Sequence, residues 1–139
     1  MRYISENLQK DLSKKMVILS GPRQSGKTTL ARHIAAKAGG QYFNWDIRSD
    51  QKTVRDIAWI KSAPLVVFDE LHKYPKWKNF LKGVYDEHGR KQSILVTGSA
   101  RLDTFRKSGD ALTGRFYRYR LHPVDLPEAL RYFNGDRTL

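Results

Sequence analysis

The chain has 139 residues, of which 40% are hydrophobic and 29% are charged, so it is long enough for one domain with a hydrophobic core. It contains no cysteine, which excludes disulfide bonds, cysteine-bound zinc and thiol catalysis, and no apolar run approaches the roughly 18 residues of a membrane span. The formal net charge of +12 favours association with nucleic acid or other acidic partners without choosing among them. We therefore expect a cytoplasmic globular domain with no membrane partner.

Short apolar runs alternate with helix-compatible segments, which is typical of a parallel sheet covered by helices on both faces. The pattern predicts strands at residues 16–20, 41–45, 65–69, 93–98 and 116–121. It predicts helices at residues 5–12, 27–38, 49–60, 76–88 and 104–112. This alternation indicates the α/β fold class.

A glycine-rich segment follows the first expected strand. Residues 21–28 match the pattern G-x-x-x-x-G-K-[ST], with a strand before them and a helix after them. The glycines let backbone N–H groups turn towards a phosphate, and the following helix N-terminus adds partial positive charge. Lys27 is expected to reach the β and γ phosphates, and the Thr28 hydroxyl to ligate Mg²⁺. The pattern predicts a site for ATP and ADP with Mg²⁺, lined by Gly21, Pro22, Arg23, Gln24, Ser25, Gly26, Lys27, Thr28 and Thr29.

Two carboxylates end the apolar run at residues 65–68. Asp69 and Glu70 are therefore expected at the carboxyl end of a buried strand, the edge where open α/β sheets bind ligands. We expect Asp69 to hold Mg²⁺, through a water molecule, opposite Thr28. Glu70 is placed to orient or deprotonate the water that attacks ATP.

Six segments resemble the AAA-type ATPases, and more narrowly predicted ATPases with a GPRQxGKT loop and a C-terminal domain of unassigned function. They are residues 21–29, 66–70, 73–77, 81–86, 97–100 and 112–116. The resemblance implies a three-layer αβα P-loop NTPase whose five-stranded parallel sheet has the order 5-1-4-3-2. It also implies an ATPase that hydrolyses Mg-ATP to ADP and phosphate, as part of a longer or homo-oligomeric protein.

Further site residues follow only from this resemblance. Ser99, at the end of the fourth strand, resembles the polar sensor of the γ-phosphate, and Thr97 is the weaker choice. Arg115 resembles the arginine finger that reaches the nucleotide of a neighbouring subunit, where a guanidinium neutralises charge on the transferred phosphoryl group. His72 departs from the resemblance, because glutamine is frequent at its position.

The last part of the chain differs from the rest. Pro123 and Pro127 indicate turns, and a short helix is expected at residues 128–133. We therefore expect the nucleotide-binding domain at residues 1–122, and the start of a C-terminal extension or a truncated lid at 123–139.

Two alternatives stay open. A nucleotide-gated switch would bind Mg-ATP with little or no turnover and signal to an attached domain. Nucleic acid is a candidate partner, since residues 115–120 interleave arginines with aromatic side chains that stack on bases. The same alternation is the ordinary pattern of a half-buried strand, which is the interpretation we favour.

Overall fold

The computed structural model describes residues 2–22, 26–89, 91–99 and 114–121. In chain order the elements are α1 (Arg2–Leu12), β1 (Met16–Ser20), α2 (Lys27–Ala38), β2 (Gln41–Asn44), α3 (Arg48–Arg55), β3 (Leu65–Asp69), the 3-10 helix η1 (Leu71–Lys73), α4 (Trp77–His88), β4 (Ser93–Gly98) and β5 (Phe116–Arg120). The helices expected at 104–112 and 128–133 lie outside the described residues, as does the expected division at residue 122.

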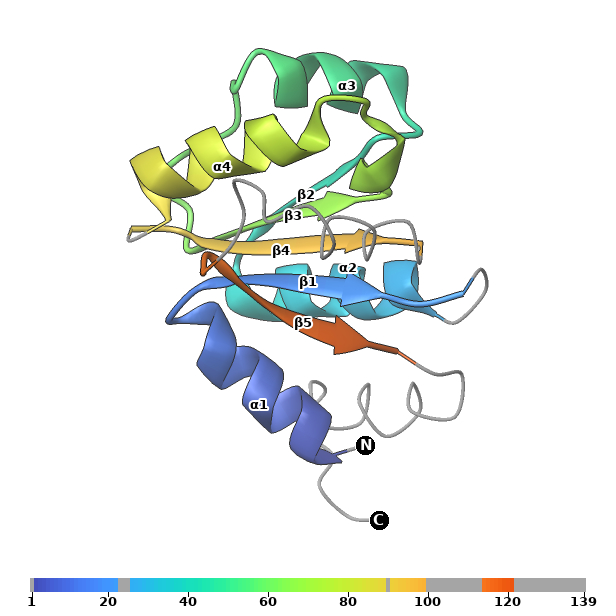
Figure 1. The fold of residues 1–139 in the computed structure, drawn as a ribbon, viewed down its shortest axis with the longest axis vertical. Helices are drawn as coiled ribbons and strands as arrows, with labels where there is room; N and C mark the ends of the chain where they lie inside the picture. Colours follow the sequence, from blue (N-terminus) through green and yellow to red (C-terminus); the bar gives the residue numbers. More distant parts are fainter. Residues whose placement is uncertain (1, 23–25, 90, 100–113, 122–139) are drawn as a thin grey trace.

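One five-stranded sheet organises the domain, in the order β2-β3-β4-β1-β5 (Figure 1). Every neighbouring pair of strands is parallel. This is the predicted order 5-1-4-3-2, so the expected fold class is confirmed. The carboxyl ends of all five strands therefore lie along one edge of the sheet.

Both faces of the sheet are buried, which explains why the inner strands are apolar runs rather than alternating patterns. In β1, Met16 and Ile18 pack on the same side as α3 and α4, whereas Val17 and Leu19 pack on the side of α1 and α2. β3 and β4 divide their side chains in the same way. The result is a three-layer αβα domain with a hydrophobic core on each side of the sheet.

The expected helix at 49–60 is wrong in its extent, because α3 ends at Arg55. Ile57 has a φ of 51°, a left-handed conformation that a helix cannot continue through. The Trp59 indole then donates a 3.0 Å hydrogen bond to Gln92 Oε1, and the Gln92 amide donates to the carbonyl of Ile60. This tertiary contact replaces the last helical turn. The other boundaries differ by three residues or fewer, and η1 was not expected.

The aromatic residues of β5 contribute to packing. Tyr119 donates a 2.6 Å hydrogen bond to Asp11 of α1, and Lys15 Nζ lies 5.2 Å from the centre of the Tyr117 ring. Both tyrosines pack against the core on the α1 side, and β5 pairs along its whole length with β1. The strand interpretation of residues 116–120 is therefore confirmed.

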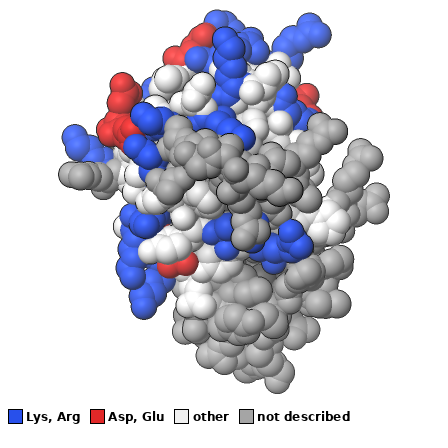
Figure 2. Space-filling model, viewed as in Figure 1, with Lys and Arg blue, Asp and Glu red and all other residues white. Residues whose placement is uncertain are grey.

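Basic residues outnumber acidic ones in the sequence, with 26 Lys and Arg against 14 Asp and Glu. Figure 2 shows Lys and Arg spread over the described part of one face, with acidic side chains only in small groups. No helix among the described residues is long and apolar enough to cross a membrane.

We predict that Leu95→Ala destabilises the domain by about 2–5 kcal/mol, since Leu95 is fully buried in β4 and its loss leaves a cavity. Ile60, whose residue is 59% exposed, is the control: Ile60→Ala should change the unfolding free energy by about 0.5 kcal/mol or less. Urea denaturation with comparison of the midpoints and slopes measures both effects. Equal losses for the two variants would contradict the described core.

Candidate nucleotide-binding site

The candidate site is built where three strands end. β1 leads through Gly21 and Pro22 towards α2, β3 ends at Asp69, and β4 ends at Gly98. β4 pairs with both of the other two strands, so these three ends are adjacent. The parallel sheet therefore brings together residues that are far apart in the sequence.

Lys27 begins α2 and is the buried cation of the site. Its side chain folds back over the loop, where Nζ donates hydrogen bonds of 2.8 Å each to the carbonyls of Gly21 and Pro22. Burial lowers the pKa of Lys27, and the negative charges of Glu70 and Asp69 oppose this shift. The ammonium group thus lies inside the loop and in the field of both carboxylates.

Gly26 makes the entry into α2 possible. Its φ of 92° lies in the left-handed region, which glycine adopts without the steric cost of a Cβ atom. The turn places the helix N-terminus at the loop, where unpaired N–H groups and the helix dipole favour an anion. Residues 23–25, with Arg23, Gln24 and Ser25, lie outside the described residues, and Thr29 is exposed in the first turn.

Asp69 is fully buried, and three hydroxyl groups donate hydrogen bonds to its carboxylate. Thr28 Oγ1 donates to Oδ2 over 2.8 Å, joining the start of α2 to the end of β3. Tyr42, from β2, donates to the same oxygen, and Thr97, from β4, donates to Oδ1. Four elements of the fold therefore fix the position of one carboxylate.

Sequence reasoning missed Tyr42 as a site residue. Burial and its hydrogen bond to Asp69 raise the pKa of Tyr42 to about 12, so the phenol stays a donor at neutral pH. The Arg32 guanidinium lies 4.9 Å from the centre of the Tyr42 ring and holds it against α2. The sheet order implied by the resemblance places β2 beside β3. This order was a signal that a side chain of β2, such as Tyr42, could lie near Asp69.

Glu70 follows β3 in a left-handed conformation with a φ of 59°, which costs of order 1–3 kcal/mol in a residue other than glycine. The turn sends Leu71 into the core, where it is 1% exposed. Glu70 Oε2 lies 3.6 Å from Nε2 of His72 and 3.4 Å from Nζ of Lys73. Lys73 is itself paired with Asp46, at 2.7 Å, after the end of β2.

The two residues considered as the polar sensor have different positions. Thr97 is fully buried, and its hydroxyl is engaged by Asp69. Ser99 lies just beyond the end of β4, is partly exposed, and donates its backbone N–H to Nδ1 of His72 over 3.2 Å. Ser99 is therefore more exposed to solvent than Thr97.

Arg115 lies at the other edge of the sheet. It precedes β5, and its carbonyl accepts a hydrogen bond from the N–H of Met16, where β1 begins. Its guanidinium contacts both carboxylate oxygens of Asp86 in α4, at 2.8 and 3.4 Å. Within one chain, Arg115 is thus separated from Lys27 by the length of the strands.

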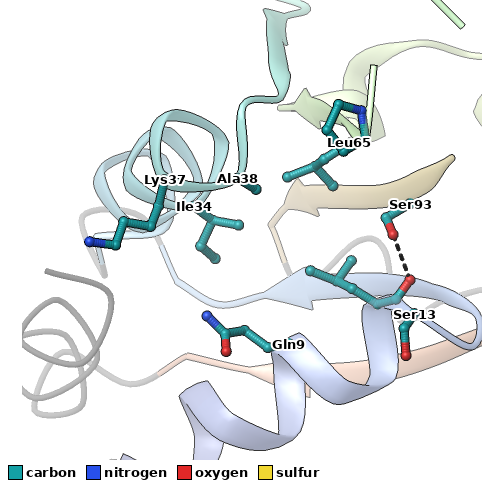
Figure 3. Close-up of a pocket in the computed structure, with 9 residues that line it drawn as sticks. Gln9, Ser13, Ile34, Lys37, Ala38, Leu65 and Ser93 are labelled. Atoms are coloured by element: carbon teal, nitrogen blue, oxygen red, sulfur yellow. Dashed lines mark hydrogen bonds between the residues drawn. The ribbon is translucent and has the colours of Figure 1, made fainter. Parts of the chain in front are cut away.

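A cavity of about 280 Å³ is also distant from the loop. It lies between the carboxyl ends of α1 and α2, where Leu65 and Ser93 begin β3 and β4 (Figure 3). Its lining is mainly apolar, and the Ser93 hydroxyl is already used in a 2.9 Å hydrogen bond to the carbonyl of Leu12. Neither the position nor the lining suits a triphosphate.

The oxygen donors of Thr28 and Asp69 suit Mg²⁺, which prefers hard oxygen ligands and takes only one or two carboxylates when phosphates supply the rest. Across the described parts of the chain, no group of three or more His, Cys, Asp or Glu side chains forms a metal cage. The Thr28 hydroxyl and the Asp69 carboxylate fit a magnesium ion that binds together with a nucleotide.

The parallel sheet, the glycine-flanked loop with its buried lysine, and the carboxylate facing the helix N-terminus define a P-loop nucleotide-binding domain. Residues 13–130 match the AAA domain family, and the chain belongs to this family of P-loop ATPases. Nucleotide binding by a P-loop fold is the general property that follows.

Individual relatives cover part of the chain. Uncharacterized proteins of Mycobacterium bovis and Mycobacterium tuberculosis are each 30% identical over 102 residues, which is 72% of this chain and 23% of theirs. A shikimate kinase of Wigglesworthia glossinidia brevipalpis is 27% identical over 105 residues, or 75% of this chain and 56% of the kinase. The chain thus spans about a quarter of the length of the mycobacterial proteins and about half of the kinase.

Among solved structures, the RuvB Holliday junction branch migration motor of Thermotoga maritima has a similar fold. The TM-score is 0.54 at 24% identity, and the similarity covers 84% of this chain and 44% of the motor. At this identity the similarity speaks for the fold alone. It agrees with the parallel sheet described above.

Proposed function

We propose that this domain binds Mg-ATP and hydrolyses it to ADP and phosphate. The observation that carries the proposal is the convergence of Lys27, Thr28 and Asp69 at the carboxyl edge of the sheet, with Thr28 Oγ1 only 2.8 Å from the Asp69 carboxylate. Phosphoryl transfer needs little more than positioned cations and a positioned nucleophile. The site has residues suited to both tasks.

Each residue has a distinct part in the proposal. Lys27 and the backbone N–H groups of residues 24–29 hold the phosphates, and Lys27 neutralises charge as the terminal phosphoryl group departs. Thr28 and Asp69 would hold Mg²⁺, Thr28 through its hydroxyl and Asp69 through water, and the bound metal would supply positive charge that offsets the charge of the phosphates. Glu70 accepts a proton from the attacking water, and Ser99 contacts the γ-phosphate.

Tyr42→Phe tests the support of Asp69. The variant keeps the ring and removes one donor to the carboxylate, so we expect the Mg²⁺ concentration for half-maximal ATP binding to rise about tenfold, corresponding to about 1.4 kcal/mol. Affinity for ATP measured in EDTA should change little. Tyr117→Phe in β5 is the matched control, and an unchanged Mg²⁺ dependence of Tyr42→Phe would remove Tyr42 from the site.

We further propose that the site is completed in a homo-oligomer, with Arg115 reaching the nucleotide of a neighbouring chain. Its place at the edge opposite Lys27 suits action between chains, because it is remote from the site of its own chain. Specific activity should therefore rise with protein concentration. Arg115→Ala should lower the activity at high concentration by about 10³-fold.

A mixing experiment separates this role from a folding defect. Lys27→Ala chains, which keep Arg115, should restore turnover when mixed with Arg115→Ala chains, which keep an intact nucleotide site. Arg48→Ala, an exposed arginine of α3, is the matched control and should behave as wild type. Activity that is independent of concentration, with no recovery on mixing, would contradict the shared site.

Phosphoryl transfer to a small molecule is a second candidate, favoured by the match to shikimate kinases of Wigglesworthia glossinidia brevipalpis and Psychromonas ingrahamii. Adding shikimate to the hydrolysis assay distinguishes the two, since a kinase would form a phosphorylated product and an ATPase would release phosphate alone. Nucleotide bound without turnover at any concentration would instead favour the nucleotide-gated switch. Nucleic-acid association would then be tested by its dependence on salt.

A further inference from the structure

His72 connects two parts of the candidate site that are separate in the sequence. Its side chain is 7% exposed and lies between the turn after β3 and the end of β4. The left-handed conformation of Glu70 starts this turn, and η1 carries His72 back towards β4. A buried imidazole in this position is fixed by its polar contacts rather than by solvent.

The hydrogen bond from Ser99 identifies the tautomer of His72. Nδ1 accepts the Ser99 backbone N–H over 3.2 Å, so Nδ1 carries no proton. In the neutral imidazole the proton is then on Nε2, because one ring nitrogen donates and the other accepts. The hydrogen bond from Ser99, at the end of β4, thus makes Nε2–H the group that the ring presents to Glu70.

Nε2 faces the carboxylate of Glu70, with 3.6 Å between Nε2 and Oε2. This is longer than a hydrogen bond, and a shift of a few tenths of an ångström would close it. Lys73 lies 3.4 Å from the same oxygen. Both neighbours therefore act on one oxygen of Glu70 and limit the rotation of its side chain.

We propose that His72 is a positioning residue for Glu70, and that it makes the orientation of this carboxylate depend on the position of the backbone at Ser99. The inference rests on the proposed hydrolysis, in which Glu70 accepts a proton from water and Ser99 contacts the γ-phosphate. A movement at the end of β4 would be transmitted through Nδ1 and Nε2 to the carboxylate. Occupation of the phosphate site and activation of water are then linked through one side chain.

The first test needs no turnover. In protein with ¹⁵N-labelled histidine at neutral pH, long-range ¹H–¹⁵N spectra should show His72 as the Nε2–H tautomer, assigned by the loss of its signals in His72→Gln. The Glu70→Gln variant should shift the Nε2 resonance and leave the tautomer unchanged. Observation of the Nδ1–H tautomer, or an Nε2 resonance that does not shift in Glu70→Gln, would overturn the proposed connection of Ser99 to Glu70 through His72.

The second test measures turnover and binding separately. His72→Phe keeps a ring of similar shape without either nitrogen, and should lower kcat at least about tenfold while the Kd for Mg-ATP stays within about twofold. His72→Gln, whose amide offers one acceptor and one donor, should recover at least half of kcat. His88→Phe is the matched control, since His88 is the last residue of α4 and its side chain is 25% exposed.

The outcomes distinguish this inference from the hydrolysis on which it rests. Wild-type kcat in a folded His72→Phe protein, or an equal loss in His72→Phe and His72→Gln, would overturn the positioning role while hydrolysis stands. Absence of turnover in the wild type would remove the proposed hydrolysis, and with it the role in positioning a base. The tautomer experiment would then still decide whether His72 joins Ser99 to Glu70.

Discussion

Replacement of Lys27 with alanine should weaken Mg-ATP binding at least about 100-fold, corresponding to about 2.7 kcal/mol. Only 6% of the Lys27 residue is exposed, and its ammonium group lies in the field of two carboxylates. A charge in this position interacts with a polyphosphate more strongly than a surface charge, because water screens it less. Fluorescence anisotropy with a labelled ATP analogue measures the affinity.

Lys37 offers a matched control for this experiment. It belongs to the same helix, carries the same charge and is exposed in the last turn of α2, at the opposite end from the loop. Lys37→Ala should bind Mg-ATP with wild-type affinity. If Lys27→Ala also binds with wild-type affinity, the phosphate site is not the loop at residues 21–28.

Replacement of Glu70 with glutamine should lower kcat by about 10²–10⁴-fold and leave the affinity for Mg-ATP within about twofold. Glutamine keeps the size of the side chain and the left-handed turn, but it cannot accept the proton of the attacking water. The Lys27 ammonium keeps the attraction of Asp69, so we expect it to remain at the phosphate site. Phosphate release and equilibrium binding are measured on the same preparation.

Glu87 is the control for Glu70. Its side chain is 70% exposed on α4, so Glu87→Gln removes a carboxylate without altering the site. We expect no change in kcat or affinity for this variant. Substantial turnover in Glu70→Gln would assign the base to another group, and loss of binding would indicate that Glu70 supports the structure of the site.

The positions of the strands and of the phosphate loop could be predicted because both depend on local patterns. Residues 16–19 and 65–68 are uninterrupted apolar runs, whereas a strand with one exposed face alternates apolar and polar residues. The residues that follow the first run have the spacing of known phosphate-binding loops. The strand order itself came from the resemblance, since apolar runs do not specify which strands are neighbours.

Contacts between distant segments could not be predicted in the same way. The end of α3 depends on Trp59 meeting Gln92, and local helix propensity contains no information about that contact. The approach of Tyr42 to Asp69 depends on the register in which Asn44 lies opposite Asp69. Such contacts follow from tertiary packing, which overrides the preference of a short segment.

The most direct test of the central claim is calorimetric titration of the wild-type protein with ATP, in the presence of Mg²⁺ and in EDTA. We predict one site per chain, tighter binding when Mg²⁺ is present, displacement by ADP, and loss of the binding heat in Lys27→Ala. Failure of the folded wild-type protein to bind ATP with Mg²⁺, or undiminished binding in Lys27→Ala, would contradict a nucleotide site built on Lys27, Thr28 and Asp69.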